Sequence, residues 1–264
     1  MKIILTKLKN KILAGLIVVG TSFSVSAAPK VAVILDDMGY RLSDSQALSL
    51  PAEVAFSILP DTPLSASLSE QAYAQGRDVM LHMPMEAESG KKLGPKALTA
   101  DMQPKRIQAT LESALNSVPY AIGVNNHMGS KLTRETGPMI ALMEALKQRE
   151  LFFVDSRTTA LTVAEQTARD LGLPVARRHV FIDHQQSPEF MQQQFERLVE
   201  LAHRQGTAIA IAHPHPQTVR FLTTALQQLS DLDVQLVPVS QLFTPQLSPQ
   251  QHHSALPAAS VAPK

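Results

Sequence analysis

Short runs of apolar residues recur along the chain, and seven of them end on an acidic, amide or imidazole side chain. The polar residues at their ends are Asp37, Asp61, His82, Asn126-His127, Asp155, Asp183-His184 and His213. A strand buried in a parallel sheet reads as a continuous apolar run, and ligands bind at the carboxyl ends of such strands. The pattern therefore predicts one ring of polar groups around one site, assembled from many parts of the chain.

Segments with helical spacing alternate with these apolar runs between residues 30 and 243. The expected helices cover residues 63–75, 104–117, 136–149, 162–171, 188–204 and 217–229, and a last strand is expected over 234–239. Thr162 and Glu165 fit a capping box at the start of the fourth helix. The alternation indicates βα units, and we expect an α/β barrel of seven or eight strands. An open doubly wound sheet is the alternative, weakened by the lack of a Gly-rich nucleotide-binding motif.

The two ends of the chain differ from the middle. Four lysines within the first eleven residues, the apolar stretch 12–25 and the small residues before Ala28 predict a secretory signal peptide over residues 1–27. Its removal would leave a periplasmic or secreted protein without a stable membrane anchor; a retained anchor is the alternative. Residues 244–264 are rich in Pro, Gln, Ser and Ala and are predicted to be a disordered tail. Residues 28–243 then form one barrel domain.

Composition narrows the chemistry further. Charged residues make up 18% of the 264 residues and the formal net charge is +1, which argues against disorder of the middle part and against a nucleic-acid partner. The chain has no cysteine. Any metal must therefore be held by His, Asp or Glu, which is the ligand set of catalytic rather than closed structural zinc sites.

Three of the strand ends carry residues that could hold such a metal. Asp36-Asp37 follows the first apolar run, where a cation would keep one carboxylate ionised while its neighbour takes protons; a surface turn is the alternative. His82 ends another run, and Glu86 follows four residues later. His127 is the further candidate ligand, in a segment whose Asn and Gly content also suits an ordinary turn.

The remaining strand ends suggest contacts with a substrate and a proton donor. The Asn126 amide could bind a carbonyl or hydroxyl group, and Asp155 could bind sugar hydroxyls or orient another catalytic group. A structural ion pair with Arg157 is the alternative for Asp155. His213 is held between an apolar strand and Pro214, so it is placed rigidly enough to protonate a leaving group as a general acid.

The order of these motifs resembles the polysaccharide deacetylases with a NodB-type fold, carbohydrate esterase family 4, and more closely the divergent polysaccharide deacetylase family. The likeness covers the whole folded region. It rests on the apolar run ending in Asp36-Asp37, on His82 after a helix that ends in glycine, and on the apolar strand ending in His213. It implies an irregular TIM-type barrel with Asp36 as catalytic base, Asp37 and His82 as metal ligands, and His213 as general acid.

The chain departs from the family pattern at two places. Glu86 stands where the second motif has its second histidine, so either Glu86 or His127 completes the metal site; His127 keeps the ligand type. The arginine-bearing third motif is not recognisable. The resemblance implies a divalent metal, with zinc as the first candidate. It also implies removal of N-acetyl groups from peptidoglycan or another glycan. A degenerate barrel that binds glycan or an envelope protein is the alternative, and hydrolysis of an ester or phosphoester is a third possibility.

Overall fold

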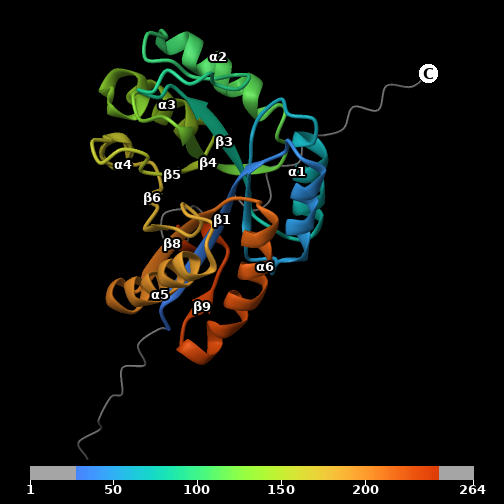
Figure 1. Cartoon of the computed structure of the whole chain (residues 1–264). Helices are drawn as coiled ribbons and strands as arrows, with labels where there is room; N and C mark the ends of the chain where they lie inside the picture. The colour runs from blue at the N-terminus through green and yellow to red at the C-terminus, as the bar shows by residue number, and fades with distance from the viewer. Residues whose placement is uncertain (1–27, 244–264) are drawn as a thin grey trace, which may run out of the picture.

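The protein is described by a computed structural model that covers residues 28–243. The predicted signal peptide (1–27) and tail (244–264) lie outside the described residues, and both stay predictions. No helix in the described range is long and apolar enough to span a bilayer. In Figure 1, strands lie at the centre and helices surround them.

The strands belong to one parallel sheet. They are β1 (Lys30–Met38), β2 (Ala55–Ile58), β3 (Val79–Met85), β4 (Ala121–Met128), β5 (Phe152–Asp155), β6 (Val175–Arg177), β7 (Val180–Phe181), β8 (Thr207–Ala212) and β9 (Gln235–Leu236). The first eight follow the order β6-β5-β4-β3-β2-β1-β8-β7, and β9 pairs with the start of β1. The expected last strand is shorter than predicted, because the chain turns into a 3-10 helix at Val239–Leu242.

The chain itself joins the two edges of this sheet. β6 pairs with β5 and β7 pairs with β8, and only Arg178 and His179 separate β6 from β7. The Arg178 amide donates to Asp155 O and the His179 amide donates to Ile209 O, so these two residues span from β5 to β8. The predicted α/β barrel is confirmed, as an irregular barrel closed on one side by a short peptide segment instead of a full ladder.

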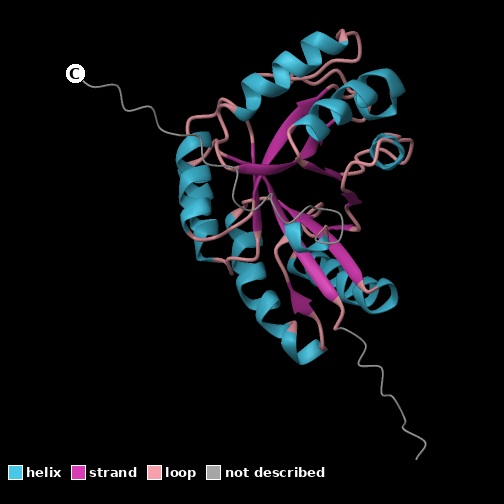
Figure 2. Cartoon of the chain, turned by 180° about the vertical axis from the view of Figure 1, so that it is seen from behind, coloured by secondary structure: helices cyan, strands magenta, loops and turns pink. Residues whose placement is uncertain are grey.

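Among the described residues, six α-helices pack on the outside of the strands, as can be followed in Figure 2. They are α1 (Ser65–Ala74), α2 (Pro104–Leu115), α3 (Thr136–Gln148), α4 (Ala164–Asp170), α5 (Pro188–Gln205) and α6 (Pro216–Ala225). All six helices expected from the sequence are present, with ends shifted by a few residues. The Ser187 hydroxyl caps α5 by accepting from the Phe190 amide, and Gly206 ends it at a φ of 81°.

The predicted capping box at the start of α4 is wrong. The N-cap residue is Val163, whose side chain makes no capping hydrogen bond, and the reciprocal pair of bonds between Thr162 and Glu165 is not formed. The Thr162 hydroxyl donates to Asp155 Oδ2 and accepts from the Ala164 amide, while Glu165 pairs with Arg169. The Thr162 hydroxyl therefore links the first amide of α4 to the buried carboxylate at the end of β5.

The strands separate two apolar layers. Odd-numbered residues of β1 such as Val31 and Val33 pack against the helices, whereas Ala32 and Ile34 belong to a smaller cluster inside the barrel. Phe243 closes the amino-terminal end of this interior by stacking on Phe152, with ring centroids 4.5 Å apart. Side chains alternate along a strand, and toward the carboxyl ends the residues that point into the barrel are polar. The apolar interior thus lies below a polar opening at the carboxyl ends of the strands, which we call the mouth of the barrel.

Candidate metal centre

Asp36 and Asp37 both face the barrel mouth, although neighbouring residues on a strand normally point to opposite sides. Leu35 pairs with Phe56 and Met38 with Ile58, so β1 carries one extra residue over this step. Asp37 adopts the left-handed conformation, with a φ of 58°. This is a β-bulge, which turns a side chain that regular pairing would direct away.

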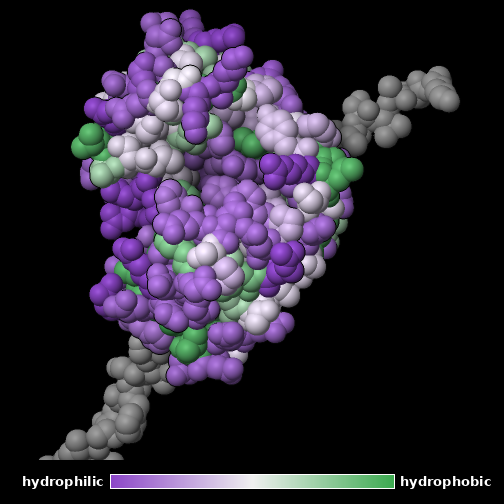
Figure 3. All heavy atoms as spheres, in the orientation of Figure 1, coloured by the Kyte–Doolittle hydropathy of each residue, from purple (hydrophilic) through white to green (hydrophobic). Residues whose placement is uncertain are grey.

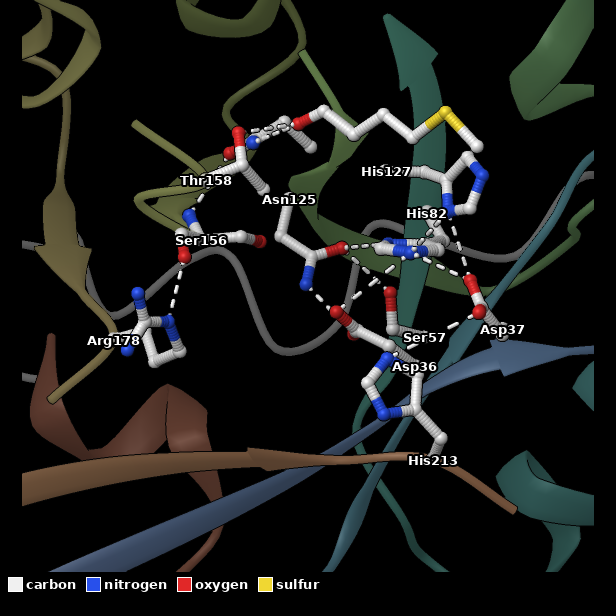
Figure 4. Close-up of polar contacts among 12 residues, drawn as sticks. Asp36, Asp37, Ser57, His82, Asn125, His127, Ser156, Thr158, Arg178 and His213 are labelled. Atoms are coloured by element: carbon white, nitrogen blue, oxygen red, sulfur yellow. Dashed lines mark hydrogen bonds and ion pairs between the residues drawn. The ribbon is translucent and has the colours of Figure 1, made fainter. Parts of the chain in front are cut away.

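Three donor atoms converge beside this bulge (Figure 4). Asp37 Oδ1 lies 2.8 Å from His127 Nδ1 and 3.1 Å from His82 Nε2, and the two imidazole nitrogens are 3.1 Å apart. Asp37 Oδ1 is buried and accepts no well-formed hydrogen bond from the described part of the chain. One carboxylate and two imidazoles around one point are the donor set of a catalytic divalent-cation site, so these residues fit the metal expected of the family.

Glu86, the other candidate ligand, is directed elsewhere. Its Oε1 lies 2.6 Å from Lys131 Nζ, and its Oε2 accepts from the Ala100 amide at 2.8 Å. Both oxygens therefore hold a surface loop, and the cluster contains His127 instead.

Asn125 connects the cluster to the catalytic candidate Asp36. Its Oδ1 lies 2.7 Å from His82 Nδ1 and accepts from the Ser57 hydroxyl at 2.6 Å, while its Nδ2 donates to Asp36 Oδ1 at 2.8 Å. A protonated Nδ1 leaves His82 Nε2 as the free nitrogen that faces Asp37, which is how outer residues orient metal-binding histidines. The sequence pattern predicted a role for Asn126 and none for Asn125 alone. Asn125 and His127 are two residues apart on one strand and so point to the same side, and this spacing could have identified Asn125.

Burial and charge shape the proton affinities in this cluster. Burial raises the pKa of Asp36, partly offset by His82 and His213. Burial works against ionised Asp37 too, but its contacts with His127 and His82 outweigh it and hold the pKa of Asp37 well below its usual range. One carboxylate of the pair is thus set to accept a proton while the other stays ionised.

His213 is held by a buried carboxylate on the opposite side of the mouth. Its Nδ1 lies 2.9 Å from Asp183 Oδ1, and Asp183 Oδ2 accepts from the His213 amide at 2.8 Å and from the Thr218 hydroxyl at 2.9 Å. Burial alone would lower the pKa of His213, but Asp183 outweighs it and raises that pKa to about 9. His213 Nε2 then points into the mouth, 3.9 Å from Asp37 Oδ2.

The two residues predicted to bind substrate lie apart from this cluster. Asn126 donates to Met128 O and accepts from the Ser156 amide, and Asp155 accepts from the Arg157 amide and the Thr162 hydroxyl. Both side chains are buried, and their described partners belong to the turns that follow β4 and β5. Their contact with a substrate stays a prediction, and the observed bonds hold the backbone around the mouth.

A cleft of about 270 Å³ opens beside the cluster. Its lining residues are Asp37, Tyr40, Arg41, Asp44, Leu59, His127, His213, Pro214 and His215. On the face seen in Figure 3 the molecule is hollowed between its upper and lower parts, and hydrophilic residues surround the hollow. Two of the candidate cation ligands, Asp37 and His127, therefore share one solvent-accessible space with the candidate proton donor His213, and His82 is buried beside them.

The sequence is similar to a known family and to bacterial relatives. A family model described as "Divergent polysaccharide deacetylase" matches residues 33–243. The protein YibQ of Escherichia coli (strain K12) is 38% identical over 235 residues, which cover 89% of this chain and 72% of that protein. A protein of Haemophilus influenzae is 38% identical over 224 residues, covering 84% and 79% of the two chains.

Solved structures show the same fold. The protein ATU2773 of Agrobacterium tumefaciens C58 superposes with a TM-score of 0.78 at 21% identity, over 83% of this chain and 91% of that one. A mutant of BA3943, described as a CE4 family pseudoenzyme with restored enzymatic activity, superposes with a TM-score of 0.51 at 13% identity, over 81% and 67%. Since the family match spans most of the sequence and the two bacterial relatives agree with it, the chain belongs to the divergent polysaccharide deacetylase family.

Proposed function

We propose that this protein is an exported, metal-dependent hydrolase that removes N-acetyl groups from a glycan of the cell envelope, such as peptidoglycan. The observation that carries the proposal is the convergence of Asp37, His82 and His127 beside a cleft that Asp37, His127 and His213 line. Family membership supports a glycan as the substrate. The basic and apolar composition of residues 1–27 supports export to the periplasm.

Each residue of the cluster has a chemical role in this proposal. A divalent cation, most simply zinc, bound by Asp37, His82 and His127 would supply a Lewis acid that polarises the acyl oxygen and favours ionised water. Asp36 takes the proton of the attacking water as a general base, which its raised pKa favours. His213 donates a proton to the amine nitrogen as the carbon–nitrogen bond breaks, and the products are acetate and a free amine.

The first test uses the purified full chain loaded with zinc and N-acetylated chito-oligosaccharides or peptidoglycan fragments, with released acetate as the readout. Asp36→Asn keeps the shape of the side chain and removes the base, so we expect kcat to fall by about 100-fold or more. Asp231→Asn, at an exposed position outside the cleft, serves as the matched control and should keep full activity. Absence of acetate release by the unaltered protein would contradict the proposal.

A glycan-binding barrel without turnover is the second candidate. The observation that favours it is Glu86, which stands where the related deacetylases carry a second histidine and which is bonded away from the cluster. A protein of this kind would bind oligosaccharide but hold no stoichiometric metal. Metal analysis of the purified protein therefore separates the two candidates.

A further inference from the structure

We propose that Asp44 and Tyr40 form a subsite for a neutral sugar residue, next to the one whose amide is cleaved. The proposal rests on the proposed function for the identity of the substrate. It starts from the loop that follows the Asp36-Asp37 bulge, where a 3-10 helix spans Leu42–Ser49.

Asp44 has one oxygen that holds this loop and one oxygen that the fold does not use. Its Oδ2 accepts from the Gly39 amide at 3.0 Å and from the Arg41 amide at 2.9 Å. Its side chain is 1% exposed, and its Oδ1 has no hydrogen-bond partner among residues 28–243. One oxygen is enough to fix the turn, and a buried acceptor without a donor is unfavourable. The free oxygen therefore indicates a donor that comes from a ligand.

The position of Asp44 shows where that ligand would lie. Asp44 and Tyr40 line the same cleft as His127 and His213, so a molecule beside them is continuous with the reacting centre. The cleft, at about 270 Å³, is close to the lower end of ligand pockets, which measure about 300–1,000 Å³. A cleft of this size admits a small ligand and excludes a folded partner.

The chemistry of the two side chains selects a sugar. Tyr40 is 53% exposed and offers an aromatic face at the edge of the cleft. A pyranose presents carbon–hydrogen bonds to such a face and hydroxyl donors at its rim, which a carboxylate oxygen accepts. Arg41 and His213 line the same cleft and offset the carboxylates of Asp44 and Asp37, so the space carries no strong charge of one sign and matches a neutral N-acetylated sugar.

Asp44→Asn tests the free oxygen without removing the loop contact. The asparagine oxygen can still accept from both backbone amides, while the free carboxylate oxygen is replaced by a donor. We expect this variant to bind a four-sugar N-acetylated chito-oligosaccharide about tenfold more weakly in calorimetric titration of the zinc-loaded full chain. In acetate-release assays the loss should appear mainly in KM, because the subsite is remote from the reacting bond.

Further variants separate the subsite from general effects on folding. Tyr40→Ala should also weaken binding of the oligosaccharide, since it removes the aromatic face. Tyr73→Ala removes a tyrosine of similar exposure on α1 that does not line the cleft, and it should bind as the unaltered protein does. Thermal unfolding of each variant checks that the fold is intact.

Different results would contradict the proposed subsite and the proposed hydrolase activity. Equal oligosaccharide affinity and equal KM in Asp44→Asn and the unaltered protein would overturn the subsite, while acetate release by both would leave the hydrolase standing. Weaker binding in Asp44→Asn with no acetate release by the unaltered protein would support the subsite and overturn hydrolysis.

Discussion

Asn125 contacts the side chains of Ser57, His82 and Asp36, and each of these is buried. Its carbonyl and amide ends differ in hydrogen-bond character, so it holds His82 in one protonation form and Asp36 in one orientation. The backbone of Asp37 is left-handed, and this conformation brings the adjacent carboxylates of Asp36 and Asp37 to one site. The candidate metal centre therefore depends on residues that orient its side chains, such as Asn125, as much as on the candidate ligands.

Asn125→Ala tests this positioning role. The change removes a hydrogen bond from each of three buried polar side chains, so we expect the free energy of unfolding to fall by about 3 kcal/mol. Zinc affinity should fall by about 10- to 100-fold, because His82 is no longer oriented. Urea unfolding and competition with a chelator measure the two effects. Asn116→Ala, at an exposed position at the end of α2, should change the unfolding free energy by less than about 0.5 kcal/mol.

Inside the barrel, a strand needs a small residue where a large side chain of the neighbouring strand lies against it. Gly123 lies on β4 and pairs with Phe152 on β5. A Cβ at position 123 would lie 2.2 Å from Cε2 of the Phe152 ring, closer than atoms can approach. Phe152 also stacks on Phe243, so it has little freedom to move away. Gly123 therefore leaves the space that the Phe152 ring occupies below the mouth of the barrel.

Gly123→Ala should destabilise the barrel through this contact. We expect a loss of about 1–3 kcal/mol in thermal or urea unfolding, typical of an overpacked core. Adding Phe152→Leu should recover part of the loss, since the smaller side chain makes room for the methyl group. Gly137→Ala, in α3 with open space around the glycine, should be neutral or slightly stabilising. Equal effects of the two glycine substitutions would contradict this account.

On the scale of the whole molecule, the site is where separate parts of the barrel meet. The three candidate ligands come from β1, β3 and β4, and His213 follows β8 on the other side of β1. The Arg178–His179 segment closes the remaining side. A cation at the centre would join strands that are far apart in sequence, so its binding energy should add to the stability of the entire fold.

Zinc should therefore raise the unfolding temperature of the full chain. At a free zinc concentration about 100-fold above the dissociation constant the gain is about 2.7 kcal/mol, which corresponds to a shift of roughly 5–10 °C for a chain of this size. Scanning calorimetry with and without zinc measures it, and a chelator should reverse it. His127→Ala should lose the shift, whereas His203→Ala, an exposed histidine of α5, should retain it. An equal shift in both variants would place zinc elsewhere.

Much of the fold could be predicted from the sequence because its signals are local. Continuous apolar runs and 3.6-residue periodicity identified most of the strands and all six helices, although the short strand β6 was not predicted. The polar residues Asp37, His82, His127 and His213 at the ends of four runs marked the mouth of the barrel. The same local logic failed for the capping box, because the Thr162 hydroxyl bonds the Ala164 amide and the distant Asp155 carboxylate, and Glu165 pairs with Arg169.

The identity of the cluster was decided by the tertiary structure alone. The sequence favoured His127 by ligand type but left Glu86 open. Lys131 and Ala100 hold Glu86 away from the cluster, and the pairing of β4 beside β3 brings His127 next to His82. The bulge that turns Asp37 inward depends on the register between β1 and β2. Apolar periodicity reports which face of an element is buried, but register and side-chain partners depend on residues distant in the chain, so only the folded protein selects them.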